Sequence, residues 1–403
     1  MASDAAVSRS QVLRDVQNFS LVLGGPTYQL LRRTHLADDA LALLVRRVVV
    51  ISLIAWLPLF LLSALEGHLL GKSVVLPFLP DVETHIRFLV VVPLLLLSEL
   101  VVHARLLPVA RAFLDRNLIP ESAMPRFDAA INSAFRLRNS VAAELLLLVL
   151  VYTVGVLIVW RRHLALQVTS WYLPVAAADP ELSGAGLWYV AVSLPIFQFL
   201  LLRWYFRIFI WARFLWQVSK IKLTLVPTHP DRVGGLGLLS NTVYAFAVLL
   251  LAHGAMVAAQ IADRVLVLGA TLPEFTTEIV VVVIFLLCVV FGPLMVFAPQ
   301  LSRTKRAALL EYGTFAERYT RDFDVKWLRG GAPANEPLLG SSDIQSLADL
   351  ANSFAVVRSM QLAPISKEAL LQLAVPVVLP IAPLLLTIMP LEALLKKLAG
   401  VLF

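Results

Sequence analysis

The chain has few of the residues on which many other folds and sites depend. It contains 403 residues but a single cysteine, Cys288, which excludes an intramolecular disulfide and a thiolate metal cluster. Cys288 lies inside an apolar run, and we expect it to serve in packing. Charged residues make up only 15% of the chain. Soluble domains usually contain about 25% charged residues, so this shortage points away from that class.

Several motifs of known chemistry are also absent. The chain holds no Gly-x-Ser-x-Gly nucleophile motif and no His-Glu-x-x-His zinc motif, so we expect no enzymatic activity of these kinds. No Cys-x-x-Cys-His attachment site exists, and ligation of haem by His103 and His253 is a minor alternative. We therefore expect no cofactor and no metal. The first 47 residues lack a short apolar core with a cleavage site, so no removable signal peptide is expected.

Long apolar runs dominate what is present. Apolar residues make up 59% of the chain, and a helix needs roughly 20 of them in succession to cross a bilayer core. Six runs reach that length, at residues 48–65, 88–107, 140–160, 187–210, 242–262 and 279–299. A seventh, residues 369–389, contains three prolines and either spans the membrane or dips in and returns. The sequence predicts an all-α polytopic membrane protein with about six to seven transmembrane helices and amphipathic cytoplasmic helices.

This pattern divides the chain into four parts. Residues 1–47 are predicted to form a cytoplasmic amphipathic segment, and residues 48–299 a six-helix transmembrane bundle with basic cytoplasmic loops. Residues 300–368 are predicted to form a cytoplasmic helical segment. Residues 369–403 would then comprise the seventh, Pro-rich transmembrane or re-entrant segment and an amphipathic C-terminus.

The distribution of lysine and arginine predicts the orientation in the membrane. With a cytoplasmic N-terminus, 27 of the 34 basic residues lie on the cytoplasmic side, as the positive-inside rule requires. The net charge of +7 is spread over several loops rather than gathered in one module, which argues against a nucleic-acid partner. We expect a multi-pass protein of the plasma (cytoplasmic or inner) membrane.

The cytoplasmic loops contain helical patterns. Residues 125–139 predict an amphipathic helix that runs straight into the third span. Ser342 and Gln345 have the spacing of a capping box, which predicts a helix reaching about Met360. Residues 309–323 predict another helix, with an apolar stripe that packs on neighbours or headgroups, or else docks a partner. The stripe consists of Tyr312, Phe315, Ala316, Tyr319 and Phe323.

Seven polar residues within the runs are the first candidate site. A rise of 1.5 Å per residue places Glu99 about 3 Å from the midpoint of its run. Charged groups at such depths cost roughly 2.5–3.5 kcal/mol, so they usually face a protein interior or water. They form either a pathway for a solute or protons, or ion pairs that hold helices in register. The candidates are Glu99, His103, Glu144, Gln198, Arg203, Arg207 and His253.

The second candidate is the glycine-rich connection at residues 227–237. Asp231 is positioned to cap the segment that follows, and exposed amides there could bind an anion with His229 and Arg232. The connection lacks the Lys-Ser/Thr ending of a phosphate loop, so a structural turn is the competing interpretation. Its candidate residues are His229, Asp231, Arg232, Gly234, Gly235 and Gly237.

Two classes of function are compatible with these features. A channel or transporter for an ion or small solute would use the intramembrane polar residues and the proline-interrupted seventh segment. The alternative is a membrane-anchored sensor or scaffold, whose basic helices bind a cytoplasmic protein or an anionic lipid. Either could be a homo-oligomer. A hydrated path to Glu99, His103 and His253 would favour the first class, and a dry bundle with an exposed cytoplasmic face the second.

Overall fold

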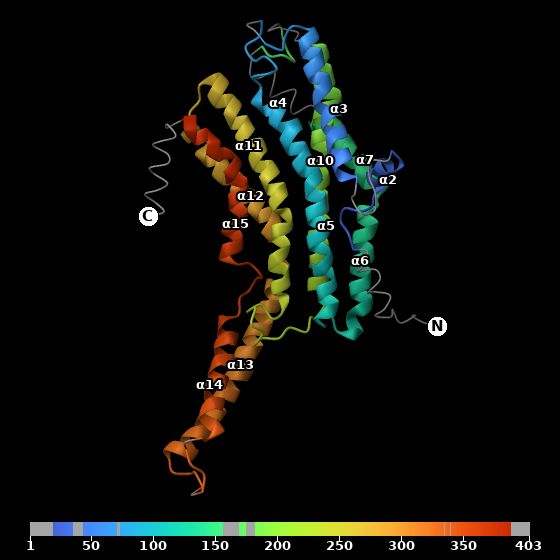
Figure 1. The fold of residues 1–403 in the computed structure, drawn as a ribbon. Coiled ribbons are helices and arrows are strands. Elements are labelled where there is room, and N and C mark those ends of the chain that lie inside the picture. Colours follow the sequence, from blue (N-terminus) through green and yellow to red (C-terminus); the bar gives the residue numbers. More distant parts are fainter. Residues whose placement is uncertain are drawn as a thin grey trace, which may run out of the picture.

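A computed structural model describes residues 19–34, 43–70, 73–155, 169–174, 182–333, 335–338 and 340–387. Within these ranges the chain is predominantly helical, and the only β-structure is a pair of isolated bridges. Figure 1 shows an elongated helical bundle with a helical hairpin projecting from one end. We call this end of the bundle the hairpin end.

Six helices among the described residues are long and apolar enough to cross a membrane. They are Leu44–Leu65, Val82–Asp115, Gly184–Ser219, Leu236–Val267, Leu272–Leu328 and Lys367–Thr387. The first is α3. The second joins α4 (Val82–Ile86) to α5 (Val92–Asp115), and the third joins α9 (Gly184–Trp188) to α10 (Leu194–Ser219), each through a π-helical turn. The fourth contains α11 (Ala247–Leu268). The chain is therefore an all-α polytopic membrane protein, as the apolar runs predict.

Among the described residues, one bent pair of helices, between the second and third of these spans in the chain, is a further candidate span. α6 (Met124–Arg138) and α7 (Val141–Leu150) belong to two segments that meet at 47°. The predicted straight continuation is wrong, because Ser140 is extended and its side chain accepts a hydrogen bond from the Ala143 amide at 3.2 Å. This cap starts a new helix. The described part of the predicted third run ends at residue 155.

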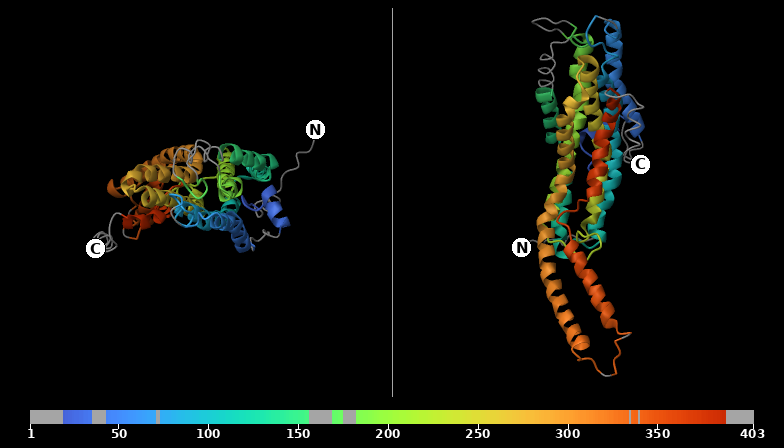
Figure 2. Two further views of the ribbon diagram at one scale, coloured as in Figure 1. Left: turned by 90° about the horizontal axis from the view of Figure 1, so that it is seen from above. Right: turned by 90° about the vertical axis from the view of Figure 1, so that its left-hand side faces the viewer.

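The longest helix connects the bundle to the hairpin. It contains α12 (Thr276–Phe291), a short 3-10 stretch and α13 (Ala298–Phe323), and its 57 residues correspond to about 85 Å. A bilayer core is only about 30 Å thick. α13 therefore leaves the bundle and packs against α14 (Ser342–Ser359), as two views show (Figures 1 and 2). The predicted boundary at residue 300 falls inside this continuous helix.

Two details of the hairpin differ from the sequence prediction. The N-cap of α14 is Ser341, whose hydroxyl accepts a hydrogen bond from the Asp343 amide at 3.1 Å, and Ser342 is the first helical residue. The preceding Gly340 has a φ of +93°, which turns the chain so that Ser341 reaches the cap position. In the predicted stripe of α13, Phe315 is 56% exposed, whereas the other four residues are half-buried.

The seventh apolar segment is a straight helix over its described residues. α15 (Lys367–Val378) and the 3-10 turn Leu379–Thr387 pack along α11, and α15 also contacts α12. Figure 1 shows α15 running beside both helices rather than turning back. Gly254 permits the close approach, because a Cβ there would lie 2.2 Å from the carbonyl oxygen of Val377. This arrangement favours a span over a re-entrant segment.

The outward faces of the bundle are apolar. In the most apolar windows of α3 and of the helix containing α12, only 22% of residues are buried. Val45 on α3, for example, is 75% exposed. Such extensive apolar surface is unfavourable in water, but lipid tails accept it. Cys288 is also exposed, so the expected packing role is wrong.

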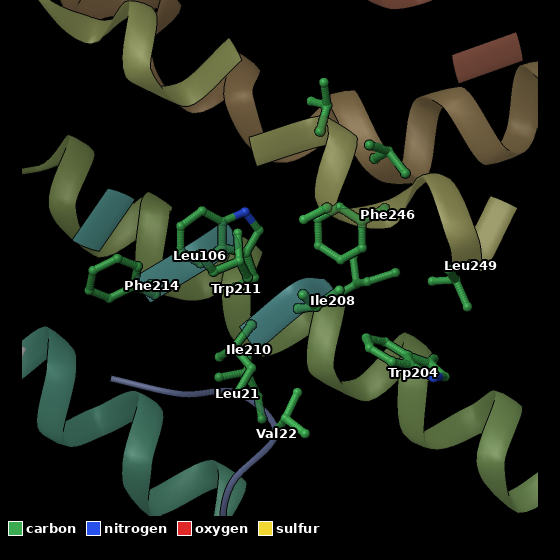
Figure 3. Packing of buried hydrophobic residues seen from close by; sticks show 14 of the residues in the cluster. Leu21, Val22, Leu106, Trp204, Ile208, Ile210, Trp211, Phe214, Phe246 and Leu249 are labelled. Carbon is green, nitrogen blue, oxygen red and sulfur yellow. The ribbon is translucent and has the colours of Figure 1, made fainter. Parts of the chain in front are cut away.

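The N-terminal segment enters the core before α2 (Pro26–Arg33) begins. Phe19, Leu21 and Val22 are buried, and the Phe19 ring lies 5.0 Å from that of Phe214 on α10. Figure 3 shows Leu21 and Val22 beside Ile210 in this cluster. No pattern in the sequence predicts this insertion. It brings backbone groups of the segment next to the polar residues described below.

Candidate functional site

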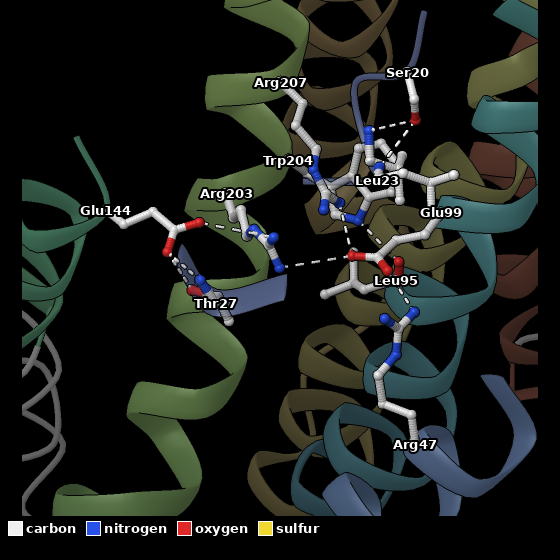
Figure 4. A network of polar contacts seen from close by, with 11 residues as sticks. Ser20, Leu23, Thr27, Arg47, Leu95, Glu99, Glu144, Arg203, Trp204 and Arg207 are labelled. Carbon is white, nitrogen blue, oxygen red and sulfur yellow. Dashed lines mark hydrogen bonds and ion pairs between the residues drawn. The ribbon is translucent and has the colours of Figure 1, made fainter. Parts of the chain in front are cut away.

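Glu99 of α5 is the centre of a buried ion-pair network (Figure 4). Its carboxylate is 2% exposed and contacts three arginines. Arg207 of α10 donates a hydrogen bond at 2.8 Å, and Arg47 of α3 donates another to the second carboxylate oxygen. Nη1 of Arg203, also on α10, lies 3.8 Å away. This arrangement compensates for the loss of hydration of the carboxylate.

Glu144 of α7 joins the same network from the other side of Arg203. One carboxylate oxygen accepts hydrogen bonds from the Thr27 amide at 2.7 Å and from the Thr27 hydroxyl at 2.5 Å. The other oxygen lies 3.7 Å from Nη2 of Arg203. Since Thr27 is in the first turn of α2, Glu144 also has a favourable position at the positive end of that helix. Arg203 therefore lies between two carboxylates.

The network lies at the level where α3 and α7 begin. Arg47 is the fourth residue of α3 and Glu144 the fourth residue of α7, so both lie within about 5 Å of the start of their helices. Beyond Glu99 and Arg203, α5 and α10 each continue for about 24 Å toward the hairpin end. The sequence predicts Glu99 near the midpoint of its apolar run, and the structure places it level with the starts of α3 and α7.

The two candidate histidines have separate partners. Nδ1 of His103 lies 3.0 Å from the Ser20 hydroxyl in the inserted N-terminal segment. In α11, Nε2 of His253 lies 2.9 Å from the Tyr205 hydroxyl, and Nδ1 lies 2.7 Å from the carbonyl oxygen of Leu249. Neither histidine forms an ion pair with the network among the described residues.

Gln198 is also placed apart from the ion pairs. Its side-chain oxygen is buried and has no hydrogen-bond partner among the described residues. It lies against Gly155, where a Cβ would be 2.2 Å from that oxygen. Gly155 ends a π-helical turn, a local widening that often accompanies functional positions.

Several contributors to the network are not among the residues that the sequence singles out. Arg47 precedes the first apolar run and so falls in the predicted N-terminal segment. Arg138 at the end of α6 donates a hydrogen bond to the Ser20 carbonyl at 2.7 Å, and the Gly25 amide donates one to the Asn139 side chain at 3.0 Å. Only tertiary structure brings this segment to the network, although the proximity of Arg47 to an apolar run was a usable signal.

In the glycine-rich connection, backbone amides bind the carboxylate of Asp231, which belongs to the connection itself. The Asp231 carboxylate accepts hydrogen bonds from the amides of Val233, Gly235 and Gly237 at 2.8–3.1 Å. Burial raises the pKa of Asp231, but these amides and nearby His229 outweigh it, so the pKa lies below its ordinary value. The amides that could have bound an external anion are thus occupied. The geometry supports the structural interpretation of this connection.

Positive φ angles explain the local sequence of that connection. Arg232, Gly234 and Gly235 have φ angles of +57°, +67° and +97°. Glycine adopts such angles without strain, and an Asp231 side chain bonded to following amides stabilises them. At Gly237 a Cβ would lie 2.8 Å from the Cβ of Asp231, so close approach is the reason for this glycine.

The same connection holds the base of the hairpin. The carbonyl oxygen of Arg232 accepts a hydrogen bond from the Gln361 amide, just after α14, at 2.7 Å. Lys305 of α13 donates a hydrogen bond to the carbonyl oxygen of Met360 at 2.6 Å. The connection therefore links the bundle to the segment between α14 and α15.

A second polar cluster lies at the opposite end of the bundle and includes residues that the sequence did not single out. The Asp81 carboxylate caps α4 through Thr84, and Asp263 of α11 accepts hydrogen bonds from the amides of Val82 and Glu83 at 2.9 and 3.0 Å. These contacts satisfy donors at the start of α4. Within the described ranges, no group of three or more His, Cys, Asp or Glu residues has the arrangement of a metal site.

The fold and the buried network together define an integral membrane protein with several apolar spans. No protein-family model matches the chain, and no curated protein or solved structure matches it significantly.

Proposed function

We propose that this chain is a membrane-anchored sensor or scaffold that presents the α13–α14 hairpin to a cytoplasmic protein. The main support is the continuous helix from α12 into α13, which leaves the bundle and packs against α14. Because the helix is unbroken, a change at either end can be transmitted along it. The predicted orientation puts this end in the cytoplasm.

The composition of α14 supports partner docking. One face, toward the hairpin interior, holds Leu347, Leu350, Phe354 and Val357, which are half-buried or buried. The adjacent face consists of Ile344, Ala348, Ala351 and Ala355, all exposed. About half of the helix circumference is therefore apolar, whereas a single neighbouring helix covers only part of it. A third helix from a partner would bury the remaining face.

The state of the polar groups argues against a hydrated pathway through Glu99. Its carboxylate is in contact with three arginines, and His103 and His253 are held by Ser20 and Tyr205. A conduit is the second candidate, and the specific observation in its favour is the unpartnered side-chain oxygen of Gln198. A buried acceptor without a protein partner suits a transiently hydrated position.

Site-specific photocrosslinking in native membranes tests the docking proposal. A crosslinker at Ile344 or Ala351 should yield a discrete adduct with one cytoplasmic protein. The matched control is Leu350, on the inner face of the same helix, which should react within the chain only. Absence of an intermolecular adduct from both outer positions, in membranes where the protein is folded, contradicts the proposal.

Reconstitution distinguishes the two candidates. Purified protein in liposomes should give no ion or proton flux above that of empty vesicles. Flux that is present in the wild type and lost after Gln198→Leu would favour the conduit and overturn the sensor or scaffold assignment.

A further inference from the structure

Arg203 has hydrogen-bonding capacity that the described chain does not use. Its side chain is only 7% exposed. A guanidinium group has five N–H donors, yet its carboxylate neighbours, Glu99 and Glu144, lie 3.8 and 3.7 Å away. These are ion-pair distances and exceed hydrogen-bond length. No other interaction of Arg203 with described residues exists that would satisfy the donors.

The network around Arg203 also has an excess of positive charge. Arg47, Arg203 and Arg207 face Glu99 and Glu144, so one positive charge has no counterion among the described residues. Arg138 lies close enough to Arg207 for electrostatic repulsion, and its hydrogen bonds go to uncharged oxygens of Ser20 and Asn139. An uncompensated buried charge is unfavourable by several kcal/mol. A bound anion would remove this cost.

A further unsatisfied donor belongs to the same network. Nε of Arg47 is buried and has no hydrogen-bond partner among the described residues. Arg47 is the fourth residue of α3, and it shares Glu99 with Arg203, so the network includes the start of an apolar span. Phosphate groups of lipids are concentrated at that level of a membrane. Arginine binds phosphate through paired donors of its planar fork.

We propose that Arg203 binds a phosphate-type oxyanion within this network. Arg203 supplies the unused donors, and Arg47 and Arg207 contribute the positive potential that makes an anion favourable despite the two glutamates. Figure 4 shows Arg203 between Glu99 and Glu144, beside Thr27 of the N-terminal segment. The oxyanion comes either from a phospholipid headgroup or from free phosphate. The site is separate from the hairpin and does not depend on the proposed partner.

Thermal unfolding of the purified full chain in a phosphate-free maltoside detergent tests the site. Inorganic phosphate, added at constant ionic strength with gluconate as the replaced anion, should raise the Tm of the wild type by a few degrees and saturate. A short-chain phosphatidic acid and the matching diacylglycerol form the second arm. A response to phosphatidic acid at lower concentration than to phosphate assigns the lipid headgroup, whereas equal potency assigns the free anion.

Variants on α10 identify the ligand residue. Arg203→Gln should weaken phosphate or phosphatidic acid binding by about tenfold or more, because one charge-assisted contact is lost. Arg213→Gln is the matched control, since Arg213 lies on the same helix and donates to Ser133 outside the network. If Arg203→Gln does not fold, Arg203→Lys retains the charge without the fork and should show an intermediate loss.

The wild-type titration alone can overturn the proposal. Absence of a saturable Tm increase with both phosphate and phosphatidic acid contradicts it. An increase of the same size and midpoint in Arg203→Gln also contradicts it, because binding then occurs elsewhere.

Discussion

Glu99 illustrates how single buried charges constrain this protein. A carboxylate without partners would be strongly unfavourable at this depth, and Arg47 and Arg207 each donate a hydrogen bond to it. The same two arginines would lack a counterion if the carboxylate were removed. Each charged residue of the network is therefore paired with an opposite charge within it. A substitution of one of them should lower the stability of the fold.

Glu99→Gln should lower the free energy of unfolding by about 3–5 kcal/mol, since it leaves buried arginines unpaired. Replacing Arg207 by Met in the same chain should recover part of this loss, which a double-mutant cycle of thermal stability would measure. Glu278→Gln is the control, because its pair with Arg264 is exposed and its loss should cost less than about 1 kcal/mol. Equal, small effects of both glutamate changes would contradict the structural role.

Asp231 should make stability depend on pH. Its pKa in the folded chain lies below the unfolded value of about 3.9. The charged carboxylate therefore stabilises the fold above that pH, and the contribution is lost as pH falls through the folded pKa. The Tm advantage of the wild type over Asp231→Asn should be constant from about pH 7 to pH 5 and shrink below about pH 4. A constant difference down to about pH 3 would be inconsistent with this role.

At the scale of helices, two helices pack closely where one of them has a small residue at the contact. α11 and α15 are in contact where Gly254 faces the backbone of Val377. The proline-containing α15 can remain beside α11 because its carbonyl groups meet no side chain at this position. The spanning arrangement of the seventh segment therefore depends on one glycine of a different helix.

Gly254→Ala should destabilise the protein by about 1–3 kcal/mol, because the new methyl group would overlap the α15 backbone. Gly313→Ala in α13 is the matched control, since no atom lies within 4 Å of the added Cβ. That change should be neutral or stabilising by up to about 1 kcal/mol. The measurement is thermal unfolding of both variants in one detergent. A Gly254→Ala variant as stable as the control would refute the proposed contact between α11 and α15.

At the scale of the whole molecule, the described parts of three basic segments gather at the hairpin end. These segments are the region from the end of α5 to the start of α6, the end of α10 and the α13–α14 hairpin, whereas the start of α3 lies level with Glu99 (Figure 1). The positive-inside rule predicts that the hairpin end faces the cytoplasm.

Cysteine labelling in intact cells tests that orientation. In a Cys288→Ser background, probes at Arg116, Lys222 and Lys326 should be protected from a membrane-impermeant maleimide. A probe at Thr271, in the exposed loop before α12 at the opposite end, should react. The predicted accessible positions Lys72 and Asp179 lie outside the described residues. Reaction at Lys326 from outside would reverse the orientation.

The sequence alone determined that the chain crosses a membrane as helices. Within a bilayer, every backbone N–H and C=O group needs a hydrogen-bond partner inside the protein, and an apolar run of about 20 residues meets this need as a helix. The approximate positions of the spans therefore follow from the apolar runs. Local chemistry also identified the Asp231 turn and the start of α6. These features depend on neighbours in the chain, which a sequence displays directly.

Only the tertiary structure decided where the helices end and which charges meet. α5 and α10 continue about 24 Å beyond Glu99 and Arg203, which places these residues level with the starts of α3 and α7. The insertion of Phe19 and the pairing of Arg47 with Glu99 join segments far apart in the chain. Such contacts depend on the packing of several helices at once, and hydrophobic periodicity contains no information about the partners of a buried charge.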